Sequence, residues 1–399
     1  MARLVGTVSR GIRTPIIREG DDICKVVTES VLSAAEDQEW GFRLRDRDIL
    51  CMTEAIVARA QGNYAKVDDI AADVRAKTGG ETVGVVFPIL SRNRFAICLR
   101  GIARGVKKVV LQLSYPADEV GNHLVDDEVL DNLPVDPYSD VLDLKRYREL
   151  FGYRVHLFTG VDYVDYYQKL IEEEGAECEI IFANDPRVVL EHTKTVLACD
   201  IHTLPHTKKL LKEAGADCVL GLDDILNAPV NGSGYNASYG LLGSNKATEE
   251  SVKLFPRDAQ PLVEKIQQVI LEKTGKKIEV MVYGDGGFKD PVGGIWEFAD
   301  PVVAPFYTEG LKGTPNELKI KYLADNDFGS LEGEELRAAI RTEIEKKDSN
   351  LVGKMASEGT TPRQLTDLIG SLSDLTSGSG DKGTPVVYIQ GYFDNYSTD

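Results

Sequence analysis

The clearest indication of the fold class comes from CEIIFANDPRVVLEHTKTVLACDIHTLPHTKKLLKEAGADCVLGL, residues 178–222. This stretch contains three apolar runs, CEIIFAND, TVLACDI and DCVLGL, and the helical pattern PHTKKLLKEAG lies between the last two. A second helical pattern, VDYVDYYQKLIEEEG (161–175), comes just before the stretch. Strands separated by helices of this length form parallel βαβ units. The stretch therefore predicts a parallel α/β lobe in the middle of the chain.

The pattern continues toward the N-terminus. YRVHLF (153–158) is predicted as a further strand, whereas the acidic, proline-bearing residues 115–150 indicate loops and short helices. Short strands are predicted at DILCMT (48–53) and VGVVFPI (83–89). SRNRFAICLRGIARG (91–105) has a serine cap and an apolar stripe, as expected of a helix, and the strand KKVVLQLSY follows it.

The last third has a mixed pattern. Three helices are predicted here, at AQPLVEKIQQVILEKTG (259–275), which is amphipathic, EGEELRAAIRTEIEKKDSNLVGKM (332–355) and TPRQLTDLIGSL (361–372). Two strands are predicted, at IEVMVY (278–283) and at TPVVYIQGY (384–392), which closes the fold. We therefore predict an α/β protein, with a mixed α+β scaffold at both ends and a parallel βαβ lobe between them.

A chain of 399 residues exceeds the size at which one hydrophobic core stops growing. We predict three parts: residues 1–114 as the N-terminal part of the scaffold, 115–228 as an inserted or enlarged α/β lobe, and 229–399 as the C-terminal part, which carries the metal and nucleotide site.

Charge and composition exclude several classes of function. The 46 basic and 64 acidic side chains give a net charge of −18, which disfavours a general surface for nucleic acid. No run reaches eighteen apolar residues and the N-terminus lacks the apolar block of a signal peptide, so that we expect a cytoplasmic protein without a membrane partner. The six cysteines never form a CxxC pair and are predicted to be reduced core thiols.

The segment VYGDGGFKDPVGGIWEFADP (282–301) is the first candidate site. Asp285 would lie at the carboxyl end of a strand, where glycines allow a ligand to approach, and a carboxylate there most often holds a hard cation. Asp290, with Glu297 and Asp300, would add oxygen ligands, and Lys289 would face a phosphate or another part of the substrate. The alternative is a glycine-rich turn with solvated acids.

Two further segments suggest anion binding. VNGSGYNASYGLLGSNKATEE (230–250), which contains Asn236, offers backbone N–H groups and short amides to a phosphate or carboxylate, or else is a structural loop. Arg92 and Arg94 stand in the first turn of a predicted helix, where the helix dipole disfavours cations. A bound anion would explain the arginines of this helix, Arg92, Arg94, Arg100 and Arg104, and so would exposed acidic neighbours.

Six segments, in order, resemble the GTP-dependent γ-glutamyl ligases that add glutamate to the deazaflavin coenzyme F(420). They are TPIIREGDD (14–22), RDILCMTEAIVARAQG (47–62), YNASYGLLGSN (235–245), EVMVYGDGGFKDP (279–291), NLVGKM (350–355) and GTPVVYIQGY (383–392). The middle of the chain, about 105–230, does not resemble the compact members of that family.

The resemblance implies roles for particular residues. Asp285 matches a metal-binding aspartate, and Asn245 matches an asparagine that contacts the nucleotide. Other positions depart from the family pattern: Gly286 stands where a threonine is expected, Leu242 where an aspartate is expected, and Lys354 where a metal-associated residue is expected. Of the two lysines of the family motif, the first is Ala55 here and the second is Arg59, which keeps the charge with a different geometry.

The leading hypothesis is a GTP- or ATP-dependent, Mg²⁺- or Mn²⁺-requiring ligase that joins an amino acid, L-glutamate by the resemblance, to a small acidic acceptor such as the deazaflavin coenzyme or a folate-type pterin. The resemblance also implies a homodimer. The alternative is a small-molecule or nucleotide-binding protein that kept the scaffold and lost catalysis. The predicted site residues are Asp285 and Arg59 (catalytic); Thr14, Pro15, Arg59, Asn245, Gly353 and Lys354 (nucleotide); Asp285 and Asp290 (metal); and Arg92, Arg94, Asn236 and Lys289 (substrate).

Overall fold

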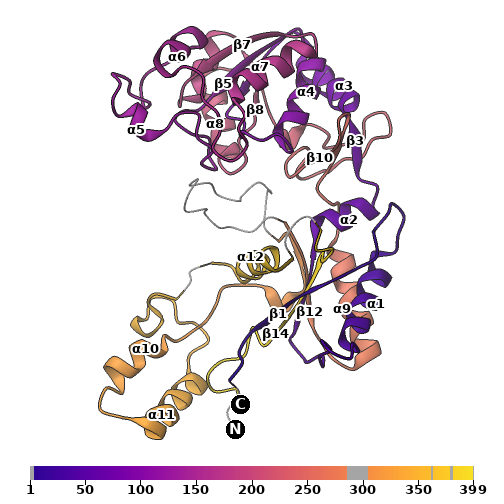
Figure 1. Cartoon of the computed structure of the whole chain (residues 1–399), viewed down its shortest axis with the longest axis vertical. Helices are drawn as coiled ribbons and strands as arrows, with labels where there is room; N and C mark the ends of the chain where they lie inside the picture. The colour runs from indigo at the N-terminus through magenta and orange to yellow at the C-terminus, as the bar shows by residue number, and fades with distance from the viewer. Residues whose placement is uncertain (1–3, 285–303, 361–362, 378–380, 399) are drawn as a thin grey trace.

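The computed structural model describes residues 4–284, 304–360, 363–377 and 381–398. Figure 1 shows three parts: a body built from both ends of the chain, a lobe built from its middle, and a small helical extension. Within the described ranges, no helix combines the length and the apolar character that crossing a membrane requires.

The body is organised around a five-stranded sheet of order β1-β14-β2-β12-β13. Its central pair, β2 and β12, is parallel, and the other pairs are antiparallel. The strands are β1 (Val8–Ile12), β2 (Ile49–Thr53), β12 (Glu279–Tyr283), β13 (Phe306–Tyr307) and β14 (Val386–Gln390).

Helices cover both faces of this sheet. Every residue of β12 and β14 is buried, which explains why the sequences of these strands are largely apolar. One face packs against α1 and α9, and the other face packs against α12. The helices of the body are α1 (Ile23–Ala35), α2 (Glu54–Ala60), α9 (Gln260–Thr274) and α12 (Leu365–Ser377).

The lobe contains a six-stranded sheet of order β6-β7-β5-β4-β8-β9, in which every pair except β6 with β7 is parallel. Helices α3, α4 and α7 pack on one face, and α8 packs on the other. The elements are α3 (Val67–Thr78), β4 (Thr82–Val86), α4 (Phe95–Gly105), β5 (Lys108–Leu113), α5 (Asp127–Leu130), β6 (Leu142–Asp143), α6 (Leu144–Phe151), α7 (Tyr163–Glu173), β7 (Glu177–Phe182), β8 (Thr195–Ala198), α8 (Leu204–Glu213) and β9 (Cys218–Gly221).

A three-stranded junction sheet joins the lobe to the body. It contains β3 (Tyr64–Lys66), β10 (Asn245–Thr248) and β11 (Ser251–Lys253), in the order β10-β11-β3. Side chains fasten the outgoing and returning segments together: Gln61 Nε2 donates to the carbonyl of Arg257 at 2.6 Å, and Asn63 Nδ2 donates to the carbonyl of Phe255 at 2.8 Å. The two passages of the chain are therefore held side by side.

The helical extension carries α10 (Ile320–Tyr322) and α11 (Gly333–Lys346). It has a small apolar cluster of its own, centred on Leu323, Ile340 and Ile344. Figure 1 shows that it projects from the body on the side away from α1 and α9.

The α/β class and the parallel lobe are confirmed, but several details differ from the sequence prediction, among them the helix predicted over 332–355, which ends at Lys346. YRVHLF (153–158) is a loop and not a strand, and its side chains at Val155, Leu157 and Phe158 are exposed. The boundary predicted between residues 114 and 115 falls inside one sheet, because β4 and β5 pair with each other and with β8 and β7. We propose instead that the lobe begins near Val67, where α3 starts.

Candidate functional site

The carboxyl ends of β2 and β12 lie at the same edge of the body sheet, because the two strands are parallel and Thr53 is paired with Tyr283. The start of β14 meets them there, since the backbone N–H of Thr53 donates to the carbonyl of Pro385 at 3.0 Å. The N–H of Thr14 donates to the carbonyl of Gly383 at 3.4 Å. Four segments that are distant in sequence thus converge at one edge, which we call the catalytic edge after the role proposed for it below.

The predicted metal ligand Asp285 comes two residues after the end of β12, as the sequence indicates. Asp285 itself lies outside the described residues, together with Gly286, Lys289, Asp290 and the acids at 297 and 300. Their assignments therefore stay predictions, whereas the strand that leads to them ends at the expected edge.

A buried ion pair occupies the catalytic edge, and the sequence analysis missed it. Lys253 Nζ lies 3.1 Å from Glu54 Oε2, with the two side chains 13% and 6% exposed. Glu54 is the first residue of α2, directly after β2, and Lys253 arrives from β11. The acid at the end of a buried strand was a visible signal for Glu54, but no local pattern pointed to Lys253.

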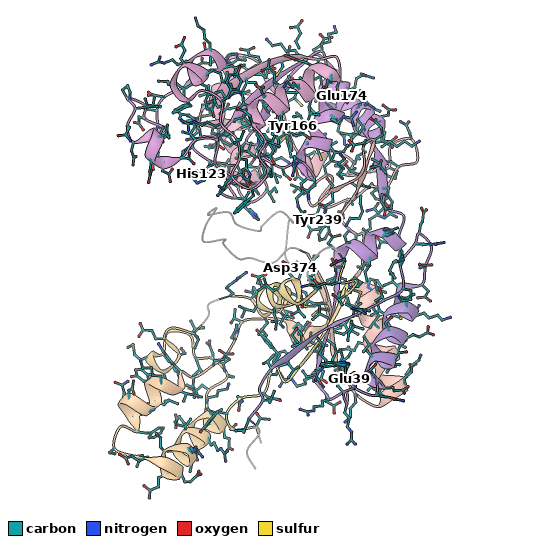
Figure 2. The ribbon with its side chains drawn as sticks, in the orientation of Figure 1. Glu39, His123, Tyr166, Glu174, Tyr239 and Asp374 are labelled. Atoms are coloured by element: carbon teal, nitrogen blue, oxygen red, sulfur yellow. The ribbon has the colours of Figure 1, made fainter. Side chains whose placement is uncertain are left out.

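A second carboxylate lies near the end of β12. Burial raises the pKa of the Tyr283 hydroxyl, and the nearby negative charges of Asp374 and Glu54 act in the same direction. Figure 2 shows Asp374 on α12, on the side of the body that faces the lobe. The edge thus combines two carboxylates with the strand that precedes Asp285.

Arg59 lies in the same neighbourhood. Burial raises the pKa of the Tyr64 hydroxyl, while the charge of Arg59 opposes that shift and the charges of Glu19 and Glu54 add to it. The segment before α1 also docks here, because the N–H of Gly20 donates to the carbonyl of Ala60 at 2.9 Å. Arg59 is therefore an exposed cation beside the acids of the catalytic edge.

Asn245 is connected to this edge through the junction sheet. In the register of that sheet, Asn245 is opposite Lys253 and Lys253 is opposite Tyr64. The next residue, Lys246, donates its backbone N–H to the carbonyl of Asn93 at 2.6 Å. The junction sheet thus brings Asn245 close to Lys253 and also to the turn that carries Arg92 and Arg94.

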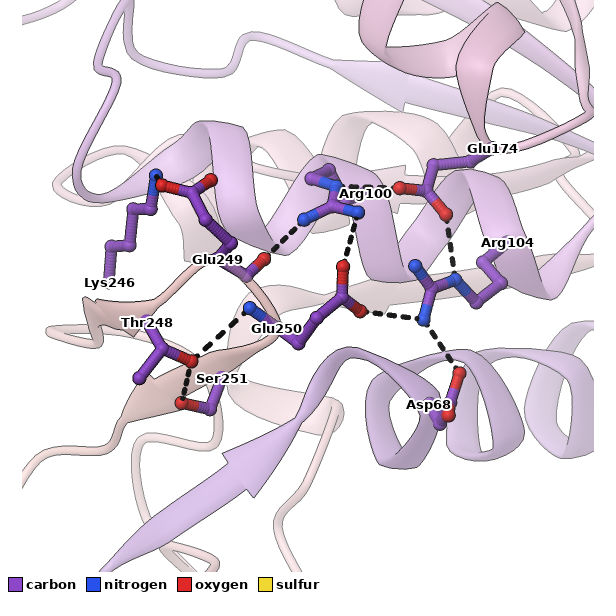
Figure 3. A network of polar contacts seen from close by, with 9 residues as sticks. All are labelled: Asp68, Arg100, Arg104, Glu174, Lys246, Thr248, Glu249, Glu250 and Ser251. Atoms are coloured by element: carbon purple, nitrogen blue, oxygen red, sulfur yellow. Dashed lines mark hydrogen bonds and ion pairs between the residues drawn. The ribbon is translucent and has the colours of Figure 1, made fainter.

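Two other arginines of the same segment bind acidic neighbours. Glu174 receives Arg100 Nε at 2.6 Å on one oxygen and Arg104 Nε at 2.7 Å on the other. Glu250 receives both guanidinium groups as well, and Arg104 also reaches Asp68 (Figure 3). Acidic partners therefore account for Arg100 and Arg104, and this network fastens the β10–β11 hairpin to the lobe.

Comparison with known proteins identifies the family. A family model for F420-0:Gamma-glutamyl ligase matches residues 11–391. The chain belongs to this family. The match includes both ends of the chain, which form the body, and it runs across the lobe. A search of individually curated proteins gives no match.

Two of the predicted ligase site residues are engaged elsewhere. Asn236 is buried, donates to the carbonyls of Phe255 and Pro256, and accepts from two backbone N–H groups of its own loop. Lys354 pairs with Asp348 within the helical extension, next to Gly353. Because these contacts use the side chains of Asn236 and Lys354, we do not retain these two residues in the proposed site, whereas Gly353 stays a prediction.

Leu242, at the position of a family aspartate, is buried in the apolar core of the lobe. It contributes no metal ligand, and its burial agrees with its apolar side chain. Among the described residues, no group of three or more histidine, cysteine, aspartate or glutamate side chains is arranged to hold a metal ion.

Arg92 and Arg94 lie in the turn between β4 and α4, and α4 begins only at Phe95. The N–H of Arg94 donates to the Ser91 hydroxyl at 3.2 Å, so that Ser91 caps this turn. Arg92 is exposed and lies near His156. Burial lowers the pKa of the His156 imidazole below 6.5, and the charges of Arg92 and His123 act in the same direction. The two predicted substrate arginines therefore belong to the lobe.

Proposed function

We propose that this ligase uses GTP or ATP to join an amino acid, L-glutamate, to the carboxyl group of a small acidic acceptor through an acyl phosphate. The observation that carries the proposal is the convergence of Thr14, Glu54, Arg59 and Lys253 at the edge where the strand before Asp285 ends. Pro15 and Asn245 complete the proposed nucleotide-binding set.

The proposed reaction has two steps. An oxygen of the acceptor carboxylate attacks the γ-phosphorus of the nucleotide, and the bond to the β-phosphate oxygen breaks, leaving the nucleoside diphosphate and the acyl phosphate. The amino nitrogen of glutamate then attacks the acyl carbon, inorganic phosphate leaves, and the nitrogen loses a proton as the amide forms. Such transfers depend on positioned cations, a role that Arg59 and Lys253 would share.

The donor set of the edge fits a divalent cation. Mg²⁺ and Mn²⁺ prefer carboxylate oxygens, and Glu54 and Asp374 lie near the end of the strand that leads to Asp285 and Asp290. Asp285 and Asp290 remain the proposed ligands, with Asp374 as a further candidate, whereas the Glu54 carboxylate is paired with Lys253. A bound ion would neutralise charge on the nucleotide phosphates.

Binding experiments test the proposal before any acceptor is known. We expect isothermal titration calorimetry to detect GTP or ATP in the presence of Mn²⁺, and Mn²⁺ electron paramagnetic resonance to detect the ion. Asp285→Ala should weaken Mn²⁺ binding at least tenfold. Asp217→Ala, at an exposed position in the lobe, should not. Equal Mn²⁺ affinity in the two variants would contradict the role of Asp285.

A second candidate function is binding without catalysis. It is favoured by the loss of family positions at Leu242 and Gly286, the first of which is buried in the lobe core. Release of phosphate in the presence of nucleotide, metal, amino acid and a deazaflavin or pterin acceptor would exclude it. We also propose a homodimer in the cytoplasm, and sedimentation velocity measures the oligomeric state directly.

A further inference from the structure

A groove of about 840 Å³ runs along the edge strand of the body, between β1 and α1. Residues of β1 and of the segment after it, Arg10 to Pro15, form one side. Val26 and Ala34 of α1 contribute apolar surface, and Trp40 and Phe42 stand in the turn that follows this helix. The volume lies within the range of small-molecule sites. The charged groups of the lining are two cations, Arg10 and Arg13, and two carboxylates, Glu29 on α1 and Asp37 in the turn, so that the cations lie on the β1 side of the groove.

Trp40 is an exposed aromatic residue on a fixed turn. Its indole is 75% exposed, yet its backbone N–H donates to Asp37 Oδ1 at 2.7 Å, and Gly41 N–H donates to the carbonyl of Asp37 at 3.1 Å. Figure 2 shows Glu39, from the same turn, at the end of the body farthest from the lobe. A large apolar side chain held in solvent by a hydrogen-bonded turn is available to a flat ligand.

Two further flat groups are held in the groove. The Arg10 guanidinium lies 4.9 Å from the centre of the Phe42 ring, and Arg10 Nη1 donates to Gln390 Oε1 at 2.8 Å. The Phe42 ring in turn lies 4.9 Å from the ring of Tyr388. Because both contacts fix Arg10, its planar guanidinium group is held in a position from which it can stack on a flat ring.

The groove leads toward the catalytic edge. At about 3.3 Å per residue, the span from Arg10 to Pro15 is at most roughly 17 Å. Its far end carries Trp40 and Phe42, and its near end carries the exposed Arg13 and reaches Thr14, which bonds the start of β14. An elongated molecule would thus place an aromatic part far from the edge and an acidic part close to it.

We propose that this groove binds the acceptor of the ligase, with a planar heteroaromatic ring beside Trp40 and an anionic arm passing Arg13 toward the catalytic edge. The identity of the ligand as acceptor rests on the proposed function. The binding of a ring-bearing anion in the groove does not, and it can be measured without nucleotide or metal.

Riboflavin 5′-phosphate and folate serve as probes, because both carry a planar ring and an anionic group. The chain has two tryptophans, Trp40 and Trp296, so that Trp296→Phe leaves Trp40 as the one fluorescent indole. We expect either probe to quench its emission, and calorimetry on the tryptophan-containing parent to give the affinity. Trp40→Ala and Arg13→Gln should each weaken binding at least tenfold, whereas Tyr138→Ala, an exposed aromatic position on the lobe, should not change it.

The outcomes separate this proposal from the proposed function. Binding of neither probe, or unchanged affinity in both groove variants, overturns the groove assignment, even if nucleotide and Mn²⁺ bind normally. Loss of probe binding in the groove variants supports it, even if nucleotide and Mn²⁺ fail to bind and the ligase chemistry has to be abandoned. Circular dichroism confirms that each variant is folded before its affinity is compared.

Discussion

Replacing Glu174 by glutamine removes the carboxylate at the centre of the arginine network in the lobe. Its two oxygens each accept from a different guanidinium group, and its side chain is 8% exposed. Removing one partner of a buried ion pair typically costs about 3–5 kcal/mol. Arg100 and Arg104 are 20% and 27% exposed and keep Glu250 as a partner. We therefore expect Glu174→Gln to lower the stability of the lobe by less than this, about 2–3 kcal/mol.

Glu250 provides a matched control, because Glu250→Gln removes the same charge from the same network. Its side chain is 58% exposed, so that the free energy lost should be below about 1 kcal/mol. The two variants have the same net charge and both preserve side-chain volume. A difference between them therefore reports burial of the carboxylate and not the overall charge of the chain.

Hydrogen exchange measured by mass spectrometry suits this comparison, because it reports on the lobe separately from the body. We expect amides of α4 and α7 to exchange roughly 30- to 150-fold faster in Glu174→Gln, the equivalent of about 2–3 kcal/mol. Glu250→Gln should change them less than about fivefold. Equal acceleration in both variants, or none in Glu174→Gln, would refute the view that the buried carboxylate holds the end of α7 to α4.

Two further predictions concern the catalytic edge and the lobe. Lys253→Met removes the Lys253 cation from the buried carboxylate of Glu54 and should lower the free energy of unfolding by about 3–5 kcal/mol, measured by urea unfolding followed by circular dichroism. Lys246→Met breaks an exposed pair and should lower it by less than about 1 kcal/mol. Similar losses in the two variants would contradict the assignment of Lys253 and Glu54 as a buried pair. Folding lowers the pKa of His156, so that the unfolded chain binds the imidazole proton more readily and the stability of the folded chain should fall as the pH drops below 6.5. In thermal unfolding between pH 7.5 and 5.5, His156→Gln should show a weaker dependence of stability on pH. An unchanged slope would contradict this role of His156.

Elements with local patterns can be predicted from the amino-acid sequence. The apolar runs at β2, β12 and β14 and the amphipathic pattern of α9 are contained within a few consecutive residues, and burial on both faces explains why the strands are largely apolar. The strand predicted at residues 153–158 is wrong, because these residues form an exposed loop and a short apolar run has no feature that distinguishes a buried strand from an exposed turn. Local patterns also located the strand before Asp285, at the edge where it was expected.

The side-chain pairs at that edge and in the lobe, in contrast, follow from the packing of distant segments. Glu54 and Lys253 are 199 residues apart, and no pattern within either segment indicates that they form a buried pair. Likewise, the partners of Arg100 and Arg104 come from α7 and the β10–β11 hairpin, so that the choice between a bound anion and acidic neighbours could not be made from the helix alone. Contacts of this kind depend on how the elements pack, because side chains from distant segments become neighbours only after the sheets and helices have assembled.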